Sequence, residues 1–251
     1  MKKKAVINDT PVCQVRMQAI SDTMSILTGK WKFHILGTLI EGNKLGFMDL
    51  LREVDGIGTK MLSKELQDLK DVLNYLLSNE NPFKTEINTN YVTLIGHSRG
   101  GGIATIFASE DTRITKLITW ASVCDFAKRT ATIGDLETWK KEGVKYVLNG
   151  RTKQQMPHKY QFYKDFKVNE TRLNIELATK RLKIPHLIVH GDSDTSIPFN
   201  EANMLHAWNP KSKLISIENG NHVFGSKHPW ENENLPKELN LVVEKSIDFI
   251  K

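Results

Sequence analysis

The sequence predicts an α/β fold in which a helical segment precedes a parallel sheet. Up to about residue 69, apolar residues recur at helical spacing. From residue 90 onward, short apolar runs rich in β-branched residues alternate with helical patterns. Such runs are typical of parallel strands that helices cover on both faces. We therefore expect two regions, residues 1–69 and 70–251.

The first region predicts three short helices joined by turns that contain glycine. Apolar residues keep helical spacing within 35–40, 47–54 and 61–69. This is the layout of a helix-turn-helix, although a small helical bundle that packs its own Leu and Ile residues would show the same pattern. The last apolar stripe continues from Leu66 to Leu77. A single helix from about Thr59 to Ser78 is therefore expected to cross the boundary between the regions.

The second region predicts four strands of one sheet, at residues 91–95, 117–120, 186–189 and 214–217. In parallel sheets of this kind, ligands bind at the carboxyl ends of the strands. Chemically reactive residues that follow a strand directly are therefore the candidates for a site.

The first predicted strand runs into Gly96-His97-Ser98-Arg99-Gly100 and then into an Ala-containing helix. A G-x-S-x-G motif between a strand and a helix is a nucleophile elbow, in which the serine hydroxyl projects at the N-terminus of the helix. The dipole of that helix favours a developing negative charge. Gly96 and Gly100 are expected because side chains there would clash with the neighbouring chain.

A serine hydroxyl needs a base to accept its proton and a third group to orient that base. His222 follows the last predicted strand and is the candidate base, while the alternative is a loop histidine without a role. Asp192 and Asp194 both follow the third strand and are the candidate acids. The order serine, aspartate, histidine therefore places each residue after its own strand.

These motifs make residues 70–251 resemble the α/β-hydrolase superfamily, in particular its esterase-like and dienelactone-hydrolase-like branches. The resemblance implies a triad of Ser98, Asp194 and His222 that transfers an acyl group from an ester, thioester or amide to water. It assigns Asp192 to the turn and makes residues 122–184 a lid insertion. Five aromatic residues of that insertion would either line an acyl pocket or pack the lid on the core: Trp139, Tyr146, Tyr160, Phe162 and Tyr163.

Residues 13–69 resemble the HxlR-type winged helix-turn-helix transcription regulators. The match includes Cys13, Gly29-Lys30-Trp31 and Lys60-Met61-Leu62-Ser63. It implies that residues 30–69 bind DNA, with Lys60, Ser63 and Lys64 reaching phosphates or bases. The wing and the dimerising helix of that family are not predicted after Leu69. The alternative function is therefore a DNA-binding regulator with a vestigial or ligand-sensing hydrolase-like part.

The hydrolase resemblance is also partial, because the strands that precede the elbow strand in that superfamily are replaced by the regulator-like helices. One oxyanion donor can be named, the backbone N–H of Arg99. The elbow strand is expected to lack one neighbour, and its open edge predicts either a homodimer or poor folding.

The composition sets further limits. The net charge is +6, but residues 1–69 hold 10 Lys and Arg against 8 Asp and Glu, so the charge is not concentrated where DNA binding is predicted. There is no long apolar run and no leader pattern, so we expect no membrane contact and a cytoplasmic protein. Cys13 and Cys124 are expected to be free thiols. We predict no metal and no cofactor, because no histidine has the partners that a metal site needs.

Overall fold

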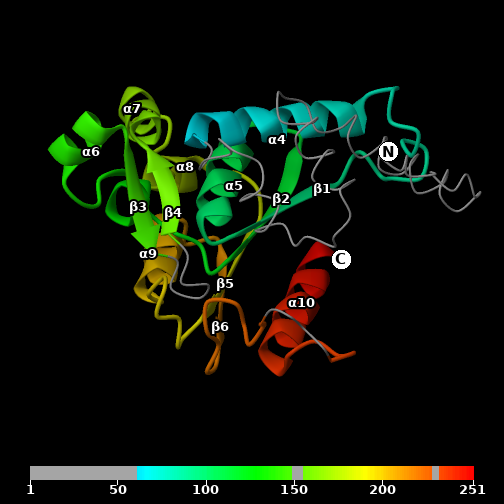
Figure 1. Ribbon diagram of the computed structural model, residues 1–251. Coiled ribbons are helices and arrows are strands. Elements are labelled where there is room, and N and C mark those ends of the chain that lie inside the picture. The colour runs from blue at the N-terminus through cyan, green and yellow to red at the C-terminus, as the bar shows by residue number, and fades with distance from the viewer. Residues whose placement is uncertain (1–60, 149–154, 228–231) are drawn as a thin grey trace, which may run out of the picture. The chain divides into compact units, whose positions relative to one another are not determined.

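The computed structural model describes residues 61–148, 155–227 and 232–251, which belong to one compact unit, Thr59–Lys251 (Figure 1). The predictions for Cys13, for Lys60 and for the helices before residue 61 lie outside the described residues. Within the described parts of the chain, no helix is long and apolar enough to cross a membrane.

Four parallel strands form the main sheet in the order β1-β2-β5-β6. Their bounds are Val92–His97 for β1, Ile114–Trp120 for β2, His186–Gly191 for β5 and Lys213–Ile217 for β6. Each overlaps one of the predicted strands. The prediction of an α/β fold with a parallel sheet is confirmed.

Helices cover both faces of this sheet, because successive residues of each strand point to opposite sides. Leu117 and Ile188 pack into a core with three helices, α5 (Arg99–Glu110), α8 (Ile175–Arg181) and α9 (Asn200–Trp208). Ile118 and Leu187 face a second core with Val242 of α10 (Lys237–Ile250). β5 is a continuous apolar run because both of its faces are buried, whereas β1 is only partly buried.

Helix α4 (Leu62–Leu77) crosses residue 69 without a break, as the apolar stripe predicts. Leu62, Leu66 and Leu73 are buried, and the helix contacts α5 and α7 (Tyr160–Val168). Val72 and Leu76 belong to the same predicted stripe, yet both are exposed. The whole of α4 is part of the compact unit that carries the sheet.

Two of the residues expected to contact DNA lie in the first turn of α4. The amide and the hydroxyl of Ser63 both donate to the carboxylate of Asp165 on α7. Lys64 is exposed and forms an ion pair with Asp68 at 2.9 Å. A contact between Ser63 and DNA would therefore require its bonds to Asp165 to break.

Between β2 and β5 the chain forms a π-helical turn, η1 (Ala127–Ala131), and then α6 (Leu136–Glu142), a hairpin, α7 and α8. The hairpin pairs β3 (Val144–Leu148) with β4 (Gln155–Lys159) antiparallel. Trp139 is 1% exposed and donates from its indole nitrogen to the carbonyl oxygen of His158 at 2.7 Å. Phe162 is equally buried, and Tyr160 and Tyr163 pack against the same core, whereas Tyr146 is 62% exposed. Four of the five aromatic residues thus pack the insertion onto the core.

Candidate active site

Ser98 lies between the end of β1 and the start of α5, where the predicted elbow falls. Its backbone has φ 57° and ψ −124°, a combination that L-residues rarely adopt and that costs of order 1–3 kcal/mol. Three hydrogen bonds hold this conformation. The Ser98 amide donates to Trp120 at 2.9 Å, and the Ser98 carbonyl accepts from Gly101 at 3.0 Å and from Val123 at 3.2 Å. The loop after β2 therefore supports the serine backbone directly.

One of the two elbow glycines is required for the reason that the sequence predicts. A Cβ atom at Gly96 would overlap the Gly100 carbonyl and approach the Cβ of Ala104 to 2.8 Å. The expectation of a clash at Gly100 is wrong, because a Cβ there would meet no atom within 4 Å. The crowded position on α5 is instead Gly101, where a Cβ would overlap the side chain of Ser122.

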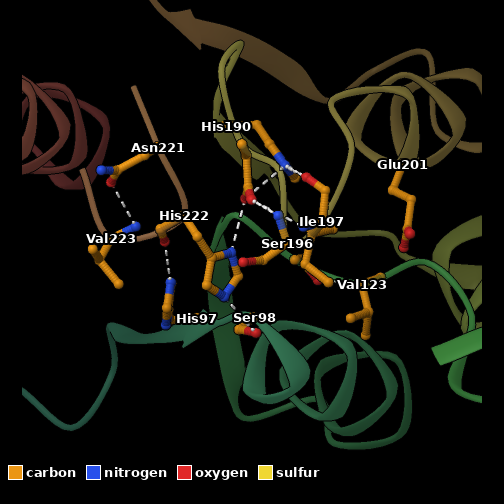
Figure 2. Close-up of polar contacts among 12 residues, drawn as sticks. His97, Ser98, Val123, His190, Ser196, Ile197, Glu201, Asn221, His222 and Val223 are labelled. Carbon is orange, nitrogen blue, oxygen red and sulfur yellow. Dashed lines mark hydrogen bonds and ion pairs between the residues drawn. The ribbon is translucent and has the colours of Figure 1, made fainter. Parts of the chain in front are cut away.

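His222 lies beside Ser98 in Figure 2, and it contacts both Ser98 and Asp194, the two residues that the sequence pairs with it. Its Nε2 atom is 3.0 Å from the Oγ atom of Ser98, and its Nδ1 atom is 2.8 Å from the Oδ2 atom of Asp194. These distances are those of hydrogen bonds. Residues 98, 194 and 222, which are far apart in the chain, therefore form one continuous chain of polar contacts.

Asp194 is held rigidly at the end of β5. Its Oδ1 atom accepts the amides of Ser196 at 2.8 Å and Ile197 at 2.9 Å, which leaves Oδ2 for His222. Asp192 is exposed and accepts the hydroxyl of Ser193 instead. Of the two candidate acids, Asp194 is the one that contacts the imidazole.

Two further histidines support the loops of this site. His190 on β5 contacts the carbonyl oxygen of Ile197 at 2.9 Å, and burial lowers the pKa of its imidazole. His97 on β1 contacts the backbone oxygen of His222 at 2.8 Å, with 4.9 Å between the ring centroids. In the sequence, His97 is part of the elbow motif and His190 precedes the loop that carries Asp194, residues 194–199, here called the acid loop. The sequence does not reveal that His97 also contacts the backbone of His222.

Arg99, the residue named as oxyanion donor, begins α5 immediately after the serine. Its guanidinium turns to α4, where Nη2 donates to the Oε1 atom of Glu65 at 2.5 Å. Its backbone amide is at the positive end of a 12-residue helix, where negative charge is stabilised. The position suits a donor to an oxyanion that forms beside Ser98.

Neither an activated thiol nor a metal cluster accompanies these residues in the described part of the chain. Cys124 is buried and free, and burial raises the pKa of its thiol to about 12, so it is protonated at neutral pH and is a poor nucleophile. Among residues 61–148, 155–227 and 232–251, no cluster of three or more His, Cys, Asp or Glu residues could hold a metal ion.

Comparison with known proteins supports a hydrolase fold. Residues 57–209, more than half of the chain, match the family described as BD-FAE. Est1E from Butyrivibrio proteoclasticus superposes with a TM-score of 0.55 and 20% identity, covering 76% of this chain and 70% of Est1E. A monoacylglycerol lipase from Paleococcus ferrophilus superposes with a TM-score of 0.54 and 13% identity, and the match covers 77% of each chain. The match to the esterase domain of a Rhodothermus marinus protein has 19% identity and a TM-score of 0.47. It covers 68% of this chain, which spans 64% of the length of that domain. No curated protein matched.

Proposed function

Because the chain belongs to the BD-FAE family and has the α/β-hydrolase fold, we propose that it is a serine hydrolase in which Ser98, His222 and Asp194 act together. Its substrate is an ester, a thioester or an amide, and carboxylic esters are the first class to test because the similar structures include a monoacylglycerol lipase. The observation that carries the proposal is the position of His222. One ring nitrogen is within hydrogen-bonding distance of the Ser98 hydroxyl, and the other is within that distance of the Asp194 carboxylate.

In the proposed mechanism, the Ser98 Oγ atom attacks the acyl carbonyl while Nε2 of His222 accepts the hydroxyl proton. The imidazolium is stabilised by Asp194, whose second oxygen is fixed by two backbone amides and therefore cannot turn away. His222 then returns the proton to the leaving alcohol, thiol or amine. Water releases the acyl group from Ser98 by the same steps, so the net reaction is hydrolysis.

The Arg99 amide is the donor that we assign to the oxyanion. In complete sites a second donor comes from a strand-to-helix loop before the elbow strand, and among the described residues helix α4 is the one element that precedes β1. Removal of one such donor costs about 100-fold to 1,000-fold in turnover. We therefore propose a slow hydrolase, with turnover below that of enzymes with two donors.

Labelling with a fluorophosphonate probe tests the proposal, because this reagent modifies an activated serine. We expect labelling of the parent protein and its loss in Ser98→Ala, together with at least a 1,000-fold fall in kcat/KM for a p-nitrophenyl acyl ester. Ser193→Ala is the matched control, since Ser193 is an exposed serine beside the acid loop. Labelling that persists in Ser98→Ala, or that is absent from the parent, would contradict the proposal.

A further inference from the structure

Glu201, in the first turn of α9, is a carboxylate that no step of the proposed mechanism uses. It is 8% exposed, although carboxylates are rarely buried unless they are paired. Its two oxygens have different partners. Oε2 accepts the backbone amide of Cys124 at 2.8 Å, and Oε1 accepts Nε of Arg129 at 2.5 Å.

Both partners belong to segments that hold the proposed triad. Cys124 follows Val123, whose amide donates to the carbonyl oxygen of Ser98. Arg129 lies on η1, and its Nη1 atom donates to the carbonyl oxygen of Ser196 at 3.3 Å. Ser196 in turn donates its amide to Asp194 at 2.8 Å. Figure 2 shows Glu201 on the side of the site where Val123, Ser196 and Ile197 lie.

We propose that Glu201 is a positioning residue that fixes the separation between two loops. One is the loop after β2, which supports Ser98, and the other is the acid loop, which carries Asp194 and to which Arg129 is the link. This inference rests on the proposed serine mechanism. His222 must contact Ser98 and Asp194 at the same time, at 3.0 Å and 2.8 Å, so a change in the separation of the two loops lengthens one of these contacts. A misplacement of about 1 Å costs about 100-fold in rate.

The charge of Glu201 is essential to this role. Arg129 is partly exposed, and its fork of donors joins the Glu201 carboxylate to a backbone oxygen of the acid loop. A glutamine at position 201 could still accept the Cys124 amide, but it would bind Arg129 weakly. A lysine at position 129 would keep the charge without the fork that reaches both acceptors.

The test compares Glu201→Gln, Arg129→Lys and Arg129→Met with the parent for hydrolysis of a p-nitrophenyl ester. We expect kcat to fall about 10-fold to 100-fold in each variant with little change in KM, because the proposed role acts through the position of the two loops and not through contact with substrate. The double variant Glu201→Gln/Arg129→Met should lose little more than either single variant. Glu176→Gln is the matched control, since Glu176 pairs with Lys180 on the exposed side of α8, and it should keep parental kinetics.

A second measurement separates positioning from stability and does not depend on activity. The proton between His222 and Asp194 gives a downfield NMR resonance, which should broaden or move upfield in Glu201→Gln and remain in Glu176→Gln. Variants that lose thermal stability but keep both the parental kcat and this resonance would overturn the inference. If the fluorophosphonate probe does not label the parent, the serine hydrolase proposal fails, whereas an unchanged resonance in Glu201→Gln would overturn the role of Glu201.

Discussion

Two strands of the same sheet carry two members of the candidate triad in very different surroundings. All six residues of β5 are buried, and the strand pairs with β2 on one side and β6 on the other. In β1 only Gly96 is fully buried, and among the described residues the strand pairs with β2 alone (Figure 1). Asp194 therefore follows a strand at the centre of the core, while Ser98 follows a strand that is only partly buried.

This difference shows what holds each residue in place. Asp194 follows a strand that packing fixes on both faces. Ser98 depends on local contacts, namely the bond of its amide to β2 and the bonds of its carbonyl to α5 and to the loop after β2. A strained serine on a weakly covered strand is consistent with the need for a buried support such as Glu201.

The difference in burial between β5 and β1 is tested most directly by shortening one isoleucine in each strand. Ile188 on β5 is 0% exposed and Ile95 on β1 is 44% exposed. We expect Ile188→Ala to lower the free energy of unfolding by about 3–5 kcal/mol because it leaves a cavity. Ile95→Ala should cost about 1 kcal/mol or less, since much of that side chain already contacts solvent. Urea denaturation of both variants measures the two losses.

Equal losses in the two variants would show that the open side of β1 is covered in solution. The predicted homodimer is one such cover, because unpaired strand edges recruit other chains. Light scattering coupled to size exclusion would then give twice the mass of the 28.6 kDa chain. A monomeric protein in which the two variants lose unequal amounts of unfolding free energy would contradict the predicted homodimer. It would support the difference in burial between the two strands.

The burial of β5 also predicts that the free energy of unfolding depends on pH. Burial lowers the pKa of His186 to about 3, so this imidazole stays neutral in the folded protein. The unfolded chain takes up the proton below the ordinary value of 6.5, so acid favours unfolding. Stability should fall as the pH drops from 6.5 towards 3, by up to about 1.4 kcal/mol per unit and about 2 kcal/mol between pH 7 and pH 5.

Urea denaturation at a series of pH values checks this prediction. His190, whose pKa burial also lowers, adds a loss of the same sign. His186→Gln should therefore reduce the slope without removing it. The glutamine keeps a polar group near the Thr119 hydroxyl, which His186 contacts at 3.0 Å. An unchanged slope in His186→Gln would show that this histidine is not held neutral.

The sequence predicts the parts of the molecule that repeat a simple pattern. Apolar runs mark the four strands, and the elbow motif places Ser98 at the end of one of them. Asp194 and His222 follow their own strands, and parallel strands end at the same edge of the sheet. The helix across residue 69 is predicted from its apolar stripe in the same way.

What could not be predicted depends on contacts between distant residues. The hairpin β3-β4 was not predicted, because Lys145 interrupts the first strand and Pro157 the second, so neither is a continuous apolar run. Glu201 and Arg129 look like ordinary surface charges in the sequence. The sequence distance of 72 residues between them leaves no local sign of their ion pair.

The smallest expected effect concerns Gly100, at the start of the helix that follows the weakly covered strand. Because an added methyl group would meet no atom within 4 Å, Gly100→Ala should fold normally. Alanine restricts the unfolded chain and favours helix, so the free energy of unfolding should rise by about 0.5–1 kcal/mol. Urea denaturation gives this change, and fluorophosphonate labelling of Ser98 should persist. A folded Gly100→Ala protein that no longer reacts with the probe would show that the acyl group, and not the neighbouring chain, needs the space beside residue 100.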